Sequence, residues 1–597
     1  MEHSNSGASN EILRHALHPK KQHDIVAVIS PAVCNVLRNL PIFFAAPDGT
    51  GMGRTVSKTS TAFFRVNAAS SGHHVRSEFV MPKFADILLK SNCIFTAAGE
   101  LPFAGYVAVA DGKILCVGKG EADEALTGPE TKVYDLGDRT VSPGFSDVHC
   151  FFTGYSIGFV GADLSSCTTE AELVSAAEAY ASTIDDSKPV LCHGWNTEAV
   201  AVNGTAALDA AFGDRPAILF AAGCETCWMN KAAYDKYQFT PDTCYPEAYV
   251  RLLPDILGDR AFIVPEFKKY MKMMNGRGVT SVKEMGFDCF YGFTDVLADL
   301  EAAGDLTLRV NFMSQPVAAD ANLEYGKAMR EKFKGEFVRF SGYNQMTDGS
   351  ISQLCGYLKK PYNCADTICA QDINWDKLAA ETRAVDAEGF RFSLHAQGDG
   401  AIGKVLDIYE TCKRDENGKM VNRHSITDLE FSDPADLERM GKMGVIAEIY
   451  PQIQSIADRE SKLAMITEKI GMDRGQYYWN RRKMADSGVL LSCGTDLPLL
   501  IDNIPESVYH AVGGYFPEGG EPFNVQNMLT VTELMTAWTK GGAYNLYCDD
   551  TLGTLEAGKK ADIAVLSGNI FTTPVEDARA LCCDLTLLGG KIVHSNL

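Results

Sequence analysis

Residues 488–496 read GVLLSCGTD, an apolar run that ends in a single carboxylate, Asp496. This pattern is typical of a buried strand that carries one acidic side chain at its carboxyl-terminal tip. Three other apolar runs end in side chains that can bind a metal or move a proton: His149, His395, and Asp428 with Glu430. A (β/α)₈ barrel enzyme needs such side chains, because its site is built from several strand ends at one rim. The sequence therefore predicts an α/β barrel.

The composition indicates a globular protein and argues against two classes of partner. The chain has 597 residues, of which 46% are hydrophobic and 22% are charged. Its net charge of −22 argues against nucleic acid, and it contains no run of about 18 apolar residues that would span a membrane. Its 18 cysteines fall in apolar runs, which is typical of reduced core residues. We expect a cytoplasmic protein that acts on a small molecule; a homo-oligomer is compatible with these features.

The first 80 residues differ from the rest of the chain. They hold six of the twelve histidines, and eight basic side chains stand against five acidic ones, although the whole chain is acidic. They also show no sustained hydrophobic periodicity. We expect residues 1–80 to be a poorly structured, dispensable leader, with the folded protein beginning near Met81.

The remaining chain divides into three segments. Residues 81–140 and 551–597 read as short strands with turns, such as the hairpin signal Asp111-Gly112. Neither segment is long enough to fold alone, so we expect them to form one small composite β-sandwich domain. Residues 141–550 alternate strand-like and helical runs, with one strand expected at 216–222. This alternation predicts a parallel sheet with crossover helices.

Five motifs together resemble one known family. They are PGFSDVH (143–149), DGSI (348–351), HAQGD (395–399), GTDLP (494–498) and GTLEAGKKAD (553–562). The set is similar to the amidohydrolase superfamily, and to its family 3 branch of N-substituted formamide deformylases and exoenzyme-regulator-like proteins, over residues 84–597. The resemblance implies a distorted (β/α)₈ TIM barrel with a small β-sandwich domain. In such enzymes one or two divalent ions activate a water, and a strand-end aspartate like Asp496 takes its proton.

Four positions depart from the pattern of that family. The opening motif usually ends His-x-His, but its last position is Phe151; a bridging lysine is usual where Asn344 stands. Histidines are usual where Asp428 and Glu225 stand. Two interpretations stay open: the site has been rebuilt with carboxylate ligands, or the metal has been lost. Because two replacements can ligate, we favour a rebuilt site for zinc, iron or manganese, without the bridging lysine of a binuclear centre.

Carried to the matching positions, the resemblance predicts the site residues. Asp496 is the expected catalytic residue. The expected metal ligands are His149, His395, Asp428, Asp496 and Glu225. The expected substrate-binding residues are Trp228, Asn230, Asp348, Arg423 and His424. Lys283 and Glu284, at another strand end, are interpreted as an ion pair.

These residues predict a metal-dependent hydrolase that acts on carbon–nitrogen bonds other than peptide bonds. Two alternatives remain. The first is a lyase, decarboxylase or isomerase reaction on the same scaffold, since a fold does not determine its chemistry. The second is a metal-free, non-catalytic barrel with a binding or regulatory role.

Overall fold

The computed structural model describes residues 84–597, with gaps at 100, 225, 245–247, 249–250, 288–289, 317–318 and 501–502, and two strands upstream. These strands, β1 (Phe63–Val66) and β2 (Ser77–Val80), pair antiparallel. The rest of residues 1–80, and with it the expected dispensable leader, lies outside the described residues. The chain forms two compact units, residues 1–84 with 123–129, and residues 85–122 with 130–597. The second unit contains every element described below.

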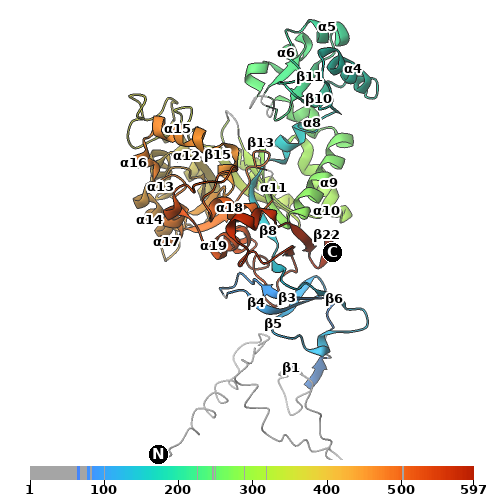
Figure 1. Cartoon of the computed structure of the whole chain (residues 1–597), viewed down its shortest axis with the longest axis vertical. Coiled ribbons are helices and arrows are strands. Elements are labelled where there is room, and N and C mark those ends of the chain that lie inside the picture. Colours follow the sequence, from blue (N-terminus) through green and yellow to red (C-terminus); the bar gives the residue numbers. More distant parts are fainter. Residues whose placement is uncertain are drawn as a thin grey trace, which may run out of the picture. The chain divides into compact units, whose positions relative to one another are not determined.

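The core of this unit is a barrel of eight parallel strands that pair in chain order (Figure 1). The last strand returns to the first, because the Asp496 amide donates to the His149 carbonyl oxygen at 2.8 Å. The Phe151 amide donates in the same way to the Leu497 carbonyl oxygen at 2.8 Å. The predicted (β/α)₈ barrel is therefore confirmed. The strands are β8 (Phe145–Cys150), β13 (Val279–Phe287), β14 (Arg309–Gln315), β15 (Val338–Met346), β16 (Phe392–Ala396), β17 (Ser425–Asp428), β18 (Ile446–Ile449) and β19 (Leu490–Cys493).

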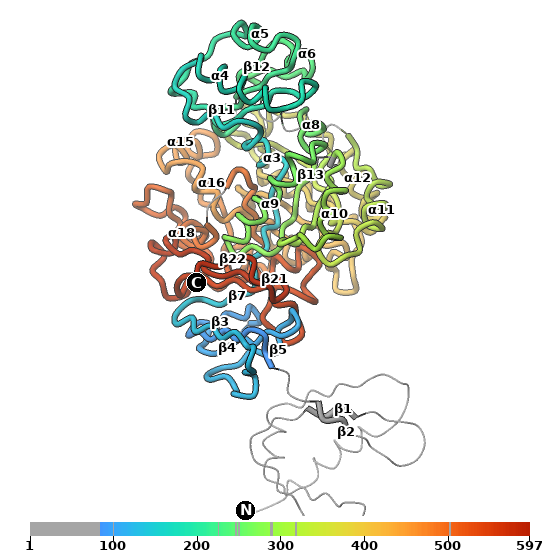
Figure 2. The backbone as a smooth tube through the Cα atoms, turned by 90° about the vertical axis from the view of Figure 1, so that its right-hand side faces the viewer, coloured from blue at the N-terminus to red at the C-terminus, as the bar shows by residue number. Residues whose placement is uncertain are grey.

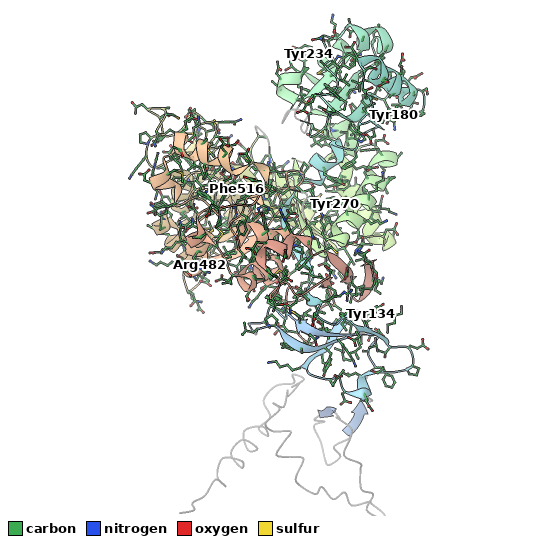
Figure 3. All side chains as sticks on the ribbon, in the orientation of Figure 1. Tyr134, Tyr180, Tyr234, Tyr270, Arg482 and Phe516 are labelled. Carbon is green, nitrogen blue, oxygen red and sulfur yellow. The ribbon has the colours of Figure 1, made fainter. Side chains whose placement is uncertain are left out.

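Helices pack around the barrel strands, which are buried on both faces as in other parallel sheets. Tyr270 illustrates this packing (Figure 3): its ring lies 5.0 Å from that of Phe152, and its hydroxyl contacts the Cys150 thiol at 3.2 Å. No described helix has the length and apolar character needed to cross a membrane. The helices are α3 (Phe152–Ile157), α9 (Arg260–Gly276), α10 (Phe293–Ala303), α11 (Leu323–Lys332), α12 (Trp375–Ala387), α13 (Asp399–Tyr409), α14 (Pro434–Met443), α15 (Arg459–Lys469), α16 (Met472–Gly475), α17 (Arg481–Asp486), α18 (Glu506–Ala511), α19 (Val531–Thr536) and α20 (Gly542–Asn545).

Helix α14 shows how local sequence sets an element's ends. The Asp433 side chain accepts a hydrogen bond from the Ala435 amide at 2.8 Å and caps the first turn. Pro434 follows, at a position where its missing N–H leaves no hydrogen bond unmade. Gly444 ends the helix in the left-handed conformation, with φ of 69°, which glycine adopts without strain.

Between β8 and β13 the chain forms a smaller α/β insert that is separate from the barrel. Its four strands make a separate sheet in the order β12-β11-β10-β9, with its own hydrophobic cluster that includes Leu173, Leu219 and Trp228. The strand expected at 216–222 is observed as β11 and belongs to this sheet, not to the barrel. The insert contains β9 (Ala162–Asp163), α4 (Glu170–Ala181), β10 (Val190–Trp195), α5 (Ala206–Phe212), β11 (Ala217–Ala221), β12 (Cys227–Met229), α6 (Lys231–Tyr237) and α8 (Leu253–Leu257).

Strands that precede and follow the barrel share one eight-stranded sheet, called here the terminal sheet (Figure 2). Strand β7 pairs parallel with β3 and antiparallel with β20. The sheet has a hydrophobic cluster of its own, to which Leu89, Val107 and Val565 contribute. The two half-sized β segments expected from the sequence therefore meet. The strands are β3 (Ile87–Ile94), β4 (Phe103–Ala110), β5 (Lys113–Lys119), β6 (Lys132–Asp135), β7 (Thr140–Pro143), β20 (Ile563–Leu566), β21 (Cys583–Leu588) and β22 (Lys591–Ser595).

Candidate functional site

Four of the predicted site residues lie at the carboxyl-terminal ends of barrel strands, as two pairs. His149 is in β8 and Asp496 follows β19; His149 Nε2 and Asp496 Oδ1 are 3.6 Å apart. His395 is in β16 and Asp428 ends β17; His395 Nε2 and Asp428 Oδ2 are 2.9 Å apart. The first separation is too long for a hydrogen bond, whereas the second is a charge-assisted hydrogen bond. We call these four side chains the barrel-mouth group.

The two aspartates of the barrel-mouth group have left-handed backbone conformations. Their φ angles are 78° at Asp428 and 52° at Asp496. This region is uncommon for residues other than glycine, although aspartate tolerates it better than most. Such conformations concentrate at functional sites, where the surrounding structure holds them in place. The backbone conformation of these two strand ends, like their carboxylates, therefore indicates a functional site.

The imidazole of His149 is oriented by a buried carboxylate. Its Nδ1 lies 3.4 Å from Glu448 Oε2. Burial alone would raise the pKa of Glu448, but the charges of Lys283 and His149 outweigh it and hold that pKa far below its usual range. Glu448 is therefore an ionised acceptor that faces His149 Nδ1. The other ring nitrogen, Nε2, faces Asp496 Oδ1.

The barrel mouth shifts the pKa of two further groups. Burial raises the pKa of Asp496 to about 6, an effect that His149 reduces and that the charge of Asp428 increases. Burial alone would lower the pKa of His395, but Asp348 and Asp428 outweigh it and raise that pKa to about 10. A carboxylate that titrates close to neutral pH therefore lies near a protonated imidazole.

The positions that would hold a second metal ion lack the family's usual ligands, although the buried Oδ1 of Asn344 has no hydrogen-bond partner among the described residues. Phe151 presents an apolar ring, whose centroid lies 5.5 Å from that of His149. The Asn344 side chain donates a hydrogen bond to Gln315 Oε1 at 2.8 Å. The structure thus replaces one ligand position with an aromatic contact and another with an amide–amide hydrogen bond.

Two of the predicted substrate-binding residues lie in the insert. Trp228 and Asn230 both line a cavity of about 330 Å³, most of whose wall is apolar. The side-chain oxygen Oδ1 of Asn230 accepts hydrogen bonds from the amides of Ala217 at 3.0 Å and Ala233 at 2.9 Å, so it caps α6 and joins it to β11. Glu225, the fifth expected ligand, lies outside the described residues.

Asp348 is held in a backbone cage beside His395. The amides of Tyr357, Gln397 and Gly398 donate to its carboxylate at 2.8, 2.9 and 3.0 Å. Its Oδ1 lies 3.5 Å from His395 Nδ1 without hydrogen-bond alignment, so it acts on that ring through its charge. The DGSI motif therefore contributes a fixed negative charge behind His395.

Arg423 and His424 lie at the other end of the barrel. They immediately precede β17, whose far end is Asp428. Arg423 donates to Asp549 Oδ1 at 2.8 Å and to the Tyr544 carbonyl oxygen at 2.7 Å. The structure does not bring these two residues to the barrel mouth.

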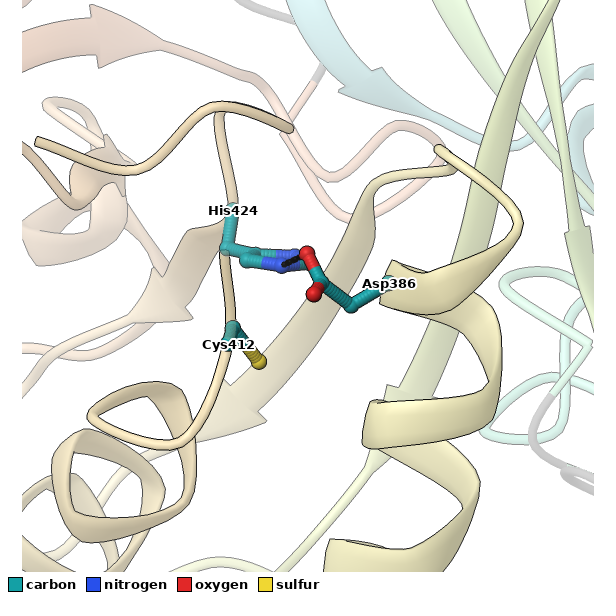
Figure 4. A group of neighbouring side chains, drawn as sticks. All are labelled: Asp386, Cys412 and His424. Atoms are coloured by element: carbon teal, nitrogen blue, oxygen red, sulfur yellow. Dashed lines mark hydrogen bonds and ion pairs between the residues drawn. The ribbon is translucent and has the colours of Figure 1, made fainter. Parts of the chain in front are cut away.

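One buried group, Asp386, Cys412 and His424, has the ligand spacing of a metal site (Figure 4). Within the described part of the chain, it is the one such group of three whose ligand atoms all lie within 4.8 Å of one another. Its histidine has no nitrogen left for a metal. The Phe392 amide donates to His424 Nδ1 at 3.1 Å, and His424 Nε2 donates to Asp386 at 3.0 Å. The group is therefore a hydrogen-bonded link between α12 and β17.

The sequence did not identify Glu448, and its interpretation of Lys283 was wrong. Lys283 forms its ion pair with Glu448, and both side chains are fully buried. Glu284 instead accepts a hydrogen bond from the Phe152 amide at 2.7 Å. Adjacent side chains of a strand point to opposite faces, so Lys283 and Glu284 do not meet. A charged residue inside each apolar strand was the available signal, but strand spacing alone does not pair them.

Comparisons with known proteins show the family and the fold of the chain. The amidohydrolase family matches residues 132–594, which is most of the chain. Protein LONG AFTER FAR-RED 3 of Arabidopsis thaliana is 23% identical and covers 85% of this chain and 92% of its own length. N-substituted formamide deformylase of Arthrobacter pascens is 23% identical, over 86% of this chain and 99% of its own. The structure of an uncharacterized metal-dependent hydrolase from Pyrococcus horikoshii OT3 has a TM-score of 0.63 at 20% identity, over 82% of this chain and 99% of that one. The resemblance seen in the motifs is confirmed, and the chain belongs to the amidohydrolase family.

Proposed function

We propose that the chain is a hydrolase that cleaves a carbon–nitrogen bond other than a peptide bond in a small molecule, with one divalent ion at the barrel mouth. The observation that carries this proposal is that His149 Nε2 faces Asp496 at 3.6 Å while Glu448 occupies His149 Nδ1. Membership of the family implies a divalent metal. The name of the deformylase relative supports carbon–nitrogen chemistry.

Within the barrel-mouth group, His149 and Asp496 supply a nitrogen and a carboxylate donor for one ion. Such donors suit zinc, iron or manganese. Two donors of one such ion lie roughly 3–4 Å apart, which agrees with the 3.6 Å between His149 and Asp496. Two partly buried carboxylates, Asp428 and Asp496, act on each other electrostatically, and a cation would stabilise both.

The same test argues against a second ion. A binuclear centre needs donors at positions 151 and 344. Phe151 has no donor, and Asn344 offers one neutral amide oxygen in place of the bridging lysine, while its Nδ2 is bound to Gln315. We therefore propose a mononuclear site.

The residues of the mouth have distinct proposed roles. A divalent ion bound there would polarise the substrate carbonyl and acidify a water. Asp496 takes the proton of the attacking water, because burial raises its pKa to about 6, close to the range where a general base works best. Gln397 Nε2 donates to Asp428 Oδ2 at 3.1 Å and holds that carboxylate beside His395. His395 must release its proton before its ring nitrogen can bind an ion.

Metal quantification on the full chain, purified without added metal or chelator, tests the proposal. We expect about one equivalent of zinc, iron or manganese per chain. His149→Asn should lose most of it, whereas His594→Asn, at a histidine of β22 in the terminal sheet, should retain it. Product analysis with N-substituted formamides and cyclic amides then separates hydrolysis from lyase or isomerase chemistry. A wild-type chain with far less than one equivalent would contradict the proposal and favour a non-catalytic barrel.

A further inference from the structure

Glu448 lies at the centre of a polar network inside the barrel. It is on β18 and is fully buried. Its Oε1 accepts hydrogen bonds from Lys283, from Ser425 Oγ at 2.6 Å and from Asn545 Nδ2 at 3.1 Å. A fourth donor, Ser393 Oγ, lies 3.4 Å away, so donors from β13, β16, β17 and α20 surround this oxygen.

The second oxygen of Glu448 has a different partner. Oε2 lies 3.4 Å from His149 Nδ1, and His149 Nε2 lies 3.6 Å from Asp496 Oδ1. Glu448, His149 and Asp496 therefore follow one another from the barrel interior to its mouth. A carboxylate on one ring nitrogen of a histidine selects the tautomer in which that nitrogen carries the proton.

Aromatic contacts leave the ring of His149 little freedom to turn. The ring meets that of Tyr450 edge to face, with centroids 5.3 Å apart, and that of Phe151 with centroids 5.5 Å apart. Packing thus restricts the plane of the ring but cannot decide which nitrogen is protonated. The contact with Glu448 can favour a proton on Nδ1 over a proton on Nε2.

We propose that Glu448 is a positioning residue that holds His149 as the Nδ1–H tautomer, so that Nε2 is available to the divalent ion at the barrel mouth. This inference rests on the proposed function, because it assigns His149 Nε2 to that ion. Partners that orient a metal-binding histidine typically change metal affinity about 10- to 100-fold when they are removed.

A double substitution removes the carboxylate without leaving a buried charge unpaired. Lys283→Met with Glu448→Met replaces a buried ion pair by apolar side chains of similar length, a change that proteins often tolerate. Ser425 Oγ keeps Ser393 Oγ as a partner at 2.5 Å, and Asn545 Nδ2 keeps Ser492 Oγ at 2.9 Å. Ser425→Ala alone is the matched control, because it removes one hydrogen bond from the same network but keeps the Lys283–Glu448 ion pair and the contact of Glu448 with His149.

The tautomer is read directly by ¹⁵N NMR on metal-free full-length protein labelled at histidine, at about pH 8, where free histidine is neutral. His149→Asn identifies the signal of His149. We expect the Nδ1–H form in the wild type and in Ser425→Ala. In the double variant we expect the Nε2–H form to appear and zinc affinity, measured by chelator competition, to fall about 10- to 100-fold relative to Ser425→Ala.

Several outcomes would overturn the inference. An Nε2–H tautomer of His149 in the wild type would overturn it. This measurement needs no variant, so it applies even if the double variant does not fold. An unchanged tautomer in the double variant would also overturn it, and so would an equal change in Ser425→Ala. A purely structural role would lower the melting temperature of the double variant but leave the tautomer unchanged. A wild-type chain that has the expected tautomer but binds no divalent ion would instead reject the proposed function.

Discussion

Asp496 is positioned by its backbone, so its carboxylate remains available for chemistry. Its amide donates to the His149 carbonyl oxygen at 2.8 Å, and its φ angle of 52° turns the chain at the end of β19. The replacement Asp496→Asn keeps the size of the side chain and both backbone features but cannot accept a proton as a base. We predict that kcat falls about 10²- to 10⁴-fold while the melting temperature is unchanged.

Asp299→Asn is a suitable control, because Asp299 pairs with Arg260 on the surface. Steady-state kinetics and thermal melting of both variants check the prediction. Similar kcat values for Asp496→Asn and the wild type would rule out the assigned base.

Phe151 allows a second test at the level of one residue. Phe151→His restores the histidine that the family usually has, and its ring would lie beside His149. We predict that metal content stays at about one ion per chain, because Asn344 still provides no bridging group between two ions. Elemental analysis of the purified variant decides this. Two ions per chain would show that position 344 does not limit the site.

Helices α17 and α19 are joined by one ion pair whose strength depends on pH. Arg482 donates to both oxygens of Glu533 at 2.6 Å (Figure 3 labels Arg482), and Glu533 also accepts from the Thr530 amide at 2.8 Å in a capping box. These hydrogen bonds, that from Arg482 above all, lower the pKa of Glu533 to about 2, although burial opposes them.

The sign of the resulting pH dependence follows from that lowered pKa. The pair stabilises the fold fully above the usual glutamate pKa of about 4.3, and this contribution is lost as pH falls towards 2. We predict that the difference in unfolding free energy between wild type and Glu533→Gln is constant from about pH 5 to 7 and shrinks below about pH 4. Denaturant titrations across this range measure it; a difference that grows on acidification would contradict the prediction.

We predict that the stability of the whole molecule depends on its carboxyl-terminal residues more than on its first eighty. Residues 551–597 supply β20, β21 and β22, and with them Leu555, Ile563 and Leu587 of the core of the terminal sheet. A chain that ends at residue 550 should therefore be insoluble or lose cooperative melting. A chain that begins at Met81 should keep the melting temperature of the full protein, as the composition of residues 1–80 predicts. A cooperative melt of the chain that ends at residue 550 would contradict the first expectation. Marked destabilisation of the chain that begins at Met81 would contradict the second.

The fold could be predicted from the sequence, because each barrel strand is a short apolar run and four of them end in a histidine or a carboxylate. The insert could not. Residues 190–195 and 217–221 have the same apolar character as barrel strands, and only pairing in space separates the two sheets. The site was predictable where a motif marks a strand end, as at His149 and Asp496. Glu448 was not, because a single acidic residue inside an apolar strand gives no indication of its partners.

The terminal sheet has a consequence for synthesis of the chain. Strand β7 ends at Pro143 and its partner β20 begins at Ile563, so 563 − 143 = 420 positions separate the two. At about 5–20 residues per second, a ribosome needs roughly 20–80 s to supply the missing strand. During that time β7 has an unpaired edge, which is open to pairing with other nascent chains. A stalled ribosome that carries the chain only to residue 550 should therefore expose residues 85–143 to protease, and release of the complete chain should protect them.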